Sequence, residues 1–353
     1  MAKSVLHTKL CDLLGVEYPI IQTGMGFVTP PRLVAAVCNA GGFGILGAAS
    51  WDVEETREKI HETKKLTDKP FGVNFLPYHP RIEELLDLLI DEKVKVASYA
   101  RAPSSKVVER TKPHGILNIA SIGAVRHAAK TEAWGIDAVI AQGMEGGGHT
   151  GYVASTVLIP EVVDTVKIPV VAAGGFCDGR GLVAALAWGA AGIAMGTRFL
   201  LTKESPIPDH IKQVYLNAPS NGTIVSDRID GLPQRVLKSR VVDILESQGR
   251  GFPLVRGIRG FFQMRQLFTE VPWWRLLESA WGRKKAYEVS LSQLALAGTF
   301  PRMLTRATVD GNADEGVMPG GQVSGIIKEI PSCQELIEHI VSQAEEILDR
   351  FGH

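Results

Sequence analysis

Eight short apolar runs recur between residues 19 and 195, and segments with helical patterning separate them. The runs begin 22 to 32 residues apart. Each run is continuous rather than alternating, as in parallel strands that are buried on both faces. The predicted strands are Pro19–Gln22, Gly44–Leu46, Phe71–Phe75, Val94–Ser98, Ile116–Ala120, Ala138–Ala141, Val170–Ala173 and Gly192–Met195. This α/β pattern predicts a TIM (β/α)8 barrel, and an open doubly wound sheet remains the alternative because periodicity does not show closure.

The rhythm of strands and helices ends after Met195. Residues 232–285 carry eleven Lys or Arg and four acids, a net charge of +7 within a chain whose 38 basic and 38 acidic residues cancel. The same stretch contains Trp273, Trp274 and Trp281. We therefore predict a barrel over residues 1–205, an inserted, mostly helical basic cap over 206–285, and a C-terminal segment, 286–353, that returns to the barrel. A merely solvated helical face is the alternative for the cap.

The C-terminal segment ends in an amphipathic helix. Ser332 and Glu335 have the spacing of a capping box. The apolar residues that follow predict one stripe packed on the barrel, and they are Leu336, Ile337, Ile340, Val341, Ala344, Ile347, Leu348 and Phe351.

Composition excludes several functions. The zero net charge argues against a nucleic-acid partner. The four cysteines form no CxxC pair, so neither a metal site nor a disulfide scaffold is expected. The low cysteine content instead predicts a reducing, cytoplasmic location. The longest apolar stretch, residues 181–197, is short and rich in glycine, which argues against a membrane partner.

Glycine-rich turns follow the last two predicted strands. Gly174 and Gly175 follow the seventh strand, and Gly196 and Thr197 follow the eighth. In (β/α)8 enzymes a phosphate often binds at backbone N–H groups of these two loops. Tight βα turns are the structural alternative, and the pair of loops favours a phosphate site.

A histidine follows three glycines at the end of the sixth strand, in Gly146-Gly-Gly-His149. Such a glycine run costs chain entropy, so it indicates that a flat group lies against the backbone. His149 would face that group as an acid or base. The alternative is an ordinary turn residue.

Five motifs in this order resemble the nitronate monooxygenase family, also called 2-nitropropane dioxygenases, and the glycine-histidine loop is shared with flavin-dependent enoyl-thioester reductases. The motifs are Gln22–Gly26, Phe71–Asn74, Gln142–Gly151, Ala172–Gly175 and Met195–Thr197. The resemblance covers nearly the whole chain, including Gly320–Gly325. It implies an FMN-containing TIM barrel with a helical insertion.

The resemblance also implies roles for individual residues. His149 would be the catalytic histidine. Residues that would contact FMN are Gln22, Gly24, Met25, Asn74, Ser121, Gln142 and Gly148, with Gly174, Gly175, Gly196 and Thr197 at its phosphate. Ser121 and Gln142 stand where some family members have ionisable residues, and the basic cap looks most like members of the family from steroid-ring degradation, whose substrates are coenzyme A thioesters.

The expected function is therefore that of an FMN-dependent oxidoreductase of the nitronate monooxygenase type. Reduction of an activated double bond in an acyl-CoA or acyl-carrier-protein thioester is one alternative, and a non-redox phosphate-binding barrel enzyme is a second. The partners would be a small-molecule substrate and either dioxygen or NAD(P)H. The oligomeric state is left open, with a homo-oligomer as one option.

Overall fold

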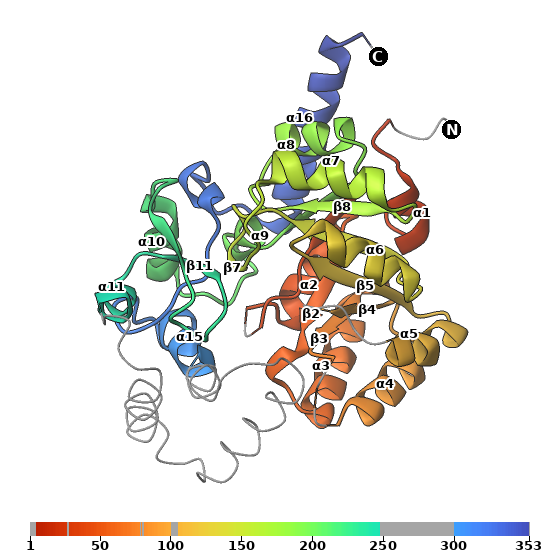
Figure 1. Ribbon diagram of the computed structural model, residues 1–353, viewed down its shortest axis with the longest axis horizontal. Coiled ribbons are helices and arrows are strands. Elements are labelled where there is room, and N and C mark those ends of the chain that lie inside the picture. The colour runs from red at the N-terminus through yellow and green to blue at the C-terminus, as the bar shows by residue number, and fades with distance from the viewer. Residues whose placement is uncertain are drawn as a thin grey trace.

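The computed structural model describes residues 5–26, 28–77, 79, 81–99, 105–247 and 300–352. Its centre is a closed barrel of eight parallel strands (Figure 1). The strands are β1 (Ile20–Gln22), β2 (Phe43–Gly47), β3 (Gly72–Phe75), β4 (Val96–Tyr99), β5 (Leu117–Ile122), β6 (Ala138–Gln142), β8 (Val170–Ala173) and β9 (Gly192–Met195). All eight predicted strands are confirmed, within a few residues at their ends.

Pairing between the first and last strands closes the barrel. Ile20, Ile21 and Gln22 of β1 pair in parallel with Ile193, Ala194 and Met195 of β9. An open doubly wound sheet is therefore excluded.

The strands are buried on both faces, as their continuous apolar character predicted. Ile21, Ile45 and Ile140 pack together inside the barrel with Leu10 and Leu14 of helix α1 (Lys9–Leu14). The alternate strand residues pack outward against the surrounding helices. These helices are α2 (Pro31–Asn39), α3 (Val53–Leu66), α4 (Ile82–Asp91), α5 (Ser105–Thr111), α6 (Val125–Ala133), α7 (Ser155–Thr165) and α8 (Gly179–Ala187).

A second group of elements follows the barrel, and most of it lies on the left in Figure 1. The group comprises α9 (Thr197–Leu200), α10 (Asp209–Asn217), β10 (Thr223–Ser226), β11 (Gln234–Leu237), α11 (Arg240–Ser247), α15 (Phe300–Thr308) and η3 (Gln322–Gly325). Strand β11 pairs in antiparallel fashion with both β10 and β7 (Gly148–His149). A mostly helical insertion was expected here, and this small sheet was not predicted.

Residues 248–285 of the predicted cap, which carry most of its basic residues, lie outside the described ranges. Trp273, Trp274 and Trp281 all fall within 248–299, together with eight of the eleven basic residues. The cap and the three domain boundaries therefore stay predictions.

The C-terminal helix α16 (Cys333–Arg350) returns to the barrel. Its capping box is confirmed, because Ser332 Oγ accepts from Glu335 N at 3.2 Å and Glu335 Oε2 accepts from Ser332 N at 2.7 Å. Leu336, Ile337 and Ile340 are buried in the outer core. The expected end of the stripe is wrong at one position, because Phe351 lies beyond the last turn of the helix and is 76% exposed. Within the described ranges, no helix has the length and apolar character needed to cross a membrane.

Candidate active site at the carboxyl end of the barrel

The carboxyl ends of all eight strands meet at one rim of a parallel barrel, and the predicted site residues lie there. Gly24, after β1, lies directly against Asn74 of β3: a Cβ placed on Gly24 would come 2.4 Å from the Asn74 Cβ. Asn74 is buried, and its Nδ2 donates to Ser98 Oγ of β4 at 3.1 Å. Glycine at position 24 therefore allows three strand ends to approach one another.

The two predicted phosphate loops also meet neighbouring loops at this rim. A Cβ on Gly196 would lie 3.2 Å from the sulfur of Met25, so the ends of β1 and β9 adjoin. Thr197 Oγ1 accepts a hydrogen bond from Gly321 N at 3.0 Å, which brings the late Gly320–Gly325 segment to the same place. The sequence showed the motif at residues 320–325 as part of the family resemblance, but it did not indicate what this segment contacts.

Gly174 and Gly175 both require a left-handed backbone, with φ of +94° and +85°. A Cβ on Gly174 would lie 2.9 Å from the carbonyl oxygen of Gly143, so the loops after β6 and β8 are in contact. A Cβ on Gly175 would have its nearest neighbour, the Glu145 Cβ, at 3.7 Å. The β8 turn thus supports the β6 loop and leaves its own second glycine accessible.

The loop after β6 presents both an open glycine and the histidine. Gly148 has φ of +71°, and a Cβ on it would meet no atom within 4 Å. Gln142 Nε2 donates to the carbonyl oxygen of His149 at 2.8 Å. The His149 side chain is 51% exposed. Gln142 therefore supports the loop, space is open beside the Gly148 backbone, and about half of the His149 side chain is exposed.

Two predicted cofactor residues, Gln22 and Ser121, lie at the rim, but their contacts say less about a cofactor than those of the glycine loops. Gln22 is fully buried, and its amide is hydrogen-bonded to the backbone of Thr23 and Ile45. It therefore shapes the floor of the site by joining β1 to β2. Ser121 is half-buried near the end of β5, in register with Ile140 of β6.

Two charged residues that the sequence analysis did not single out for the site fix the β6 loop from opposite sides. The Glu145 carboxylate accepts from the backbone N–H of Ser155, the first residue of α7, at 3.0 and 3.1 Å. Arg235 of β11 is buried, and its Nε donates to the Met144 carbonyl oxygen at 2.9 Å. Burial lowers the pKa of Arg235, and the nearby Glu145 charge opposes that shift. The loop is thus held between the barrel and the second group.

His149 has an acidic partner that the sequence analysis missed. Its Nε2 lies 2.8 Å from Oδ2 of Asp230, whose side chain is 8% exposed. Burial raises the pKa of Asp230, but hydrogen bonding to His149 and the charge of that imidazole hold it below its ordinary value. The two residues are 81 positions apart, and Asp230 lies in no motif, so only the fold brings them together.

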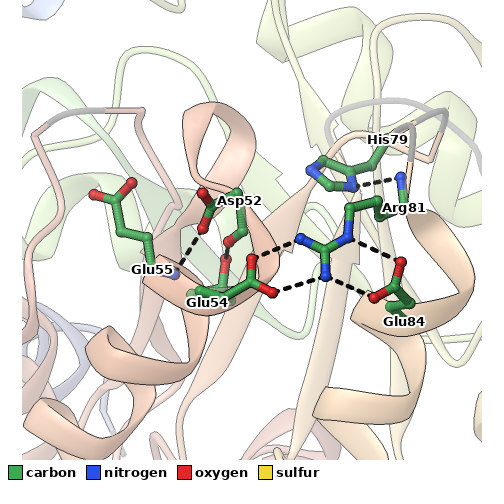
Figure 2. Close-up of polar contacts among 7 residues, drawn as sticks. Asp52, Glu54, Glu55, His79, Arg81 and Glu84 are labelled. Carbon is green, nitrogen blue, oxygen red and sulfur yellow. Dashed lines mark hydrogen bonds and ion pairs between the residues drawn. The ribbon is translucent and has the colours of Figure 1, made fainter.

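An ion-pair cluster joins the first turns of two barrel helices, which follow the carboxyl ends of β2 and β3 (Figure 2). The Arg81 guanidinium, next to α4, donates to Glu54 of α3 at 2.6 and 2.7 Å and to Glu84 of α4 at 2.8 and 2.6 Å. Hydrogen bonds from Arg81 lower the pKa of the exposed Glu54 to about 2. The cluster links two neighbouring βα loops; exposed pairs of this kind add little stability.

Other chemistry finds little support at this rim. Burial raises the pKa of the Cys177 thiol to about 11, and the side chain packs in an apolar cluster with Met25. It is therefore not an activated nucleophile. Among the described residues, no group of three or more His, Cys, Asp or Glu could hold a metal ion.

A flat cofactor with a terminal phosphate fits these features. The open space at Gly148 suits a planar ring lying against the backbone, and the left-handed turn at Gly174–Gly175 lets main-chain N–H groups approach a phosphate. Gly196 and Thr197 begin α9 beside this turn. These backbone groups would hold the phosphate, with His149 close to the ring.

The closed barrel, with a candidate site at the carboxyl ends of its strands, is the architecture of a (β/α)8-barrel enzyme. Comparison with known proteins narrows this class: the model of the family described as nitronate monooxygenase matches residues 7–85 and 78–343. The chain belongs to the nitronate monooxygenase family, and it is a flavin oxidoreductase.

Individual relatives carry two different names. A protein of Rhodococcus jostii named (3aS,4S,5R,7aS)-5-hydroxy-7a-methyl-1-oxo-octahydro-1H-indene-4-carboxyl-CoA dehydrogenase is 48% identical, over 99% of both chains. A probable nitronate monooxygenase of Staphylococcus saprophyticus is 31% identical, over 98% of this chain and 99% of the other. The solved structure of FabK from Thermotoga maritima aligns with a TM-score of 0.79 and 33% identity, over 98% of both chains.

Proposed function

We propose that this protein is an FMN-dependent oxidoreductase that acts on a coenzyme A thioester, with His149 as its acid or base. The observation that carries the proposal is the β6 loop, which presents an open Gly148 and an exposed His149 and is in contact with the glycine turn after β8. FMN fits this arrangement better than FAD, because the glycine turns provide for one terminal phosphate.

The protein's own residues supply position and proton transfer. Bound flavin would accept or donate the electrons of the reaction. Gly174, Gly175, Gly196 and Thr197 would fix the phosphate, and Gly24 and Gly148 would let the ring lie close to the backbone. The exposed imidazole of His149 would take up the proton that leaves the substrate during dehydrogenation, or return it in the reverse direction.

The substrate class rests on the relatives. The Rhodococcus jostii protein and a Mycobacterium tuberculosis protein, 47% identical over 96% of each chain, are both named as the same carboxyl-CoA dehydrogenase. The net charge of +7 in residues 232–285 agrees with a ligand that carries several phosphates. We therefore place an acyl-CoA ahead of a small nitroalkane as the substrate.

Nitronate oxidation is the second candidate. It is supported by the family match and by the relative named as a probable nitronate monooxygenase. The same acid–base residue and cofactor would serve it, with dioxygen as the oxidant, so only substrate tests separate the two reactions.

The cofactor assignment is tested with the purified protein. We expect a yellow preparation that releases FMN, and no FAD, when it is denatured, as identified by chromatography of the released flavin. Apoprotein should regain the visible absorption spectrum on addition of FMN. A colourless protein that also fails to bind added FMN would remove the flavin from the proposal and favour a non-redox phosphate-binding enzyme.

A further inference from the structure

We propose that Asp230 is the positioning residue of the reaction centre: it holds the proton of the neutral His149 ring on Nε2 and so makes Nδ1 the atom that exchanges a proton with the substrate. This inference rests on the proposed role of His149 as acid or base, and it assigns a function to a residue from outside the barrel.

The contact between the two side chains has the geometry of a fixed pair. Asp230 Oδ2 lies 2.8 Å from His149 Nε2, with the carboxylate 8% exposed and the imidazole 51% exposed. The buried acid therefore lies behind a ring that a substrate can reach. An ionised carboxylate can only accept, so in the neutral ring Nε2 carries the hydrogen and the lone pair is on Nδ1.

The small sheet holds both partners in place. His149 of β7 is paired in register with Gln234 of β11, and Thr150 N donates to the Pro233 carbonyl oxygen at 3.1 Å. Gln234 is fully buried, and in the described part of the chain its side-chain amide makes no aligned hydrogen bond. It nevertheless lies close enough to help lower the pKa of Asp230. Strand β11 thus pairs with the backbone of the loop that carries His149, and it places the polar side chain of Gln234 near Asp230.

The second oxygen of Asp230 makes the proposal testable by a nearly isosteric change. Oδ1 accepts from the backbone N–H of Leu232 at 3.2 Å. In Asp230→Asn the side-chain oxygen must stay toward that N–H, because the amide nitrogen cannot accept from it. The new NH2 group then faces His149 Nε2 and donates to it. The ring proton should therefore move to Nδ1, which removes the lone pair from the atom that we propose exchanges the proton.

The experiment combines a spectroscopic and a kinetic measurement on the holoenzyme. In protein labelled with ¹⁵N-histidine, the ring-nitrogen shifts report the tautomer, and the His149 signals are assigned by their loss in His149→Ala. We expect the Nε2–H form in the wild-type protein and the Nδ1–H form in Asp230→Asn. The variant should keep its FMN and its KM, while kcat falls roughly 10²–10⁴-fold, the scale of a lost acid or base. Asp227→Asn is the matched control, since it removes the same charge from an exposed position of the same connection, and it should behave as wild type.

An Nδ1–H tautomer in the wild-type protein would overturn the proposal, even if the Asn variant did not fold. So would an Asp230→Asn variant with the tautomer and kcat of Asp227→Asn. Failure of the proposed function looks different: the protein would then bind no FMN, or His149→Ala would turn over substrate like the wild type.

Discussion

Single residues at the barrel rim have two kinds of proposed role: the glycines leave room for close approach, and His149 supplies an ionisable group. Gly24 and Gly174 let neighbouring loops come closer than a side chain at either position would allow. His149 is the exposed ionisable group at the end of β6. Because the proposed phosphate contacts come from the backbone, cofactor binding and proton transfer depend on different residues. The two functions are therefore separable by mutation.

Replacement of His149 by Ala tests this separation. We expect FMN to stay bound, since the β8 and β9 loops are untouched, while turnover falls roughly 10²–10⁴-fold. Flavin absorbance measures binding, and steady-state kinetics at saturating substrate measures turnover. His339→Ala, which removes an exposed histidine from α16, is the control and should leave both quantities unchanged. Full activity in His149→Ala would mean that His149 is only a turn residue.

At the scale of elements, some helices carry their own start signal, and α16 is one of them. The capping box of Ser332 and Glu335 places the first turn of α16, and α16 packs its apolar stripe against the barrel. The contribution of such a cap is measurable because it satisfies backbone groups that otherwise lack partners.

We expect Ser332→Ala to lower the free energy of unfolding by about 0.5–2 kcal/mol. The side-chain oxygen that accepts from Glu335 N is lost, and Ala cannot replace it. Denaturant titration of both proteins gives the difference. Ser342→Ala, on the exposed face of the same helix, should not destabilise, because Ala favours a helix interior. Equal losses in the two variants would show that the cap contributes nothing specific.

The same elements show how far sequence reasoning reaches. The eight strands and α16 were predictable because continuous apolar runs and a capping box are local signals. Strands β10 and β11 were not, because their residues mix polar and apolar side chains instead of forming a continuous apolar run, and β11 is stabilised by pairing with a distant loop. Asp230 was missed for the same reason: its partner His149 is adjacent only in space. Gly321, by contrast, lies within a motif that the sequence did show, although its contact with Thr197 required the fold.

At the scale of the whole molecule, the barrel supplies most of the site and the second group completes it. The barrel loops provide His149 and the glycine turns, and β11 provides the strand that pairs with β7. The basic stretch that begins at β11 continues through residues outside the described ranges. Its charge leads to a prediction about the substrate.

We expect an acyl-CoA to bind more tightly than the corresponding free acid, and its affinity to fall as salt rises, because phosphates would interact with the excess of basic residues. Titration of the flavin absorbance with each ligand, at low and at high ionic strength, measures both effects. The 3′-dephospho thioester is the matched ligand, and its affinity should depend less on salt. Equal, salt-insensitive affinities would return nitronate oxidation to first place.

The pairing of β7 with β11 also has a consequence for synthesis, because β11 is translated after all the barrel strands. All eight barrel strands have been synthesised once Met195 emerges from the ribosome, but β11 begins at Gln234, and Gly321 comes later still. A nascent chain that stops short of these residues already contains every strand of the barrel, yet its His149 lacks Asp230 and its Thr197 lacks Gly321. Translation therefore makes the strands of the barrel first and the residues that complete the candidate site only afterwards.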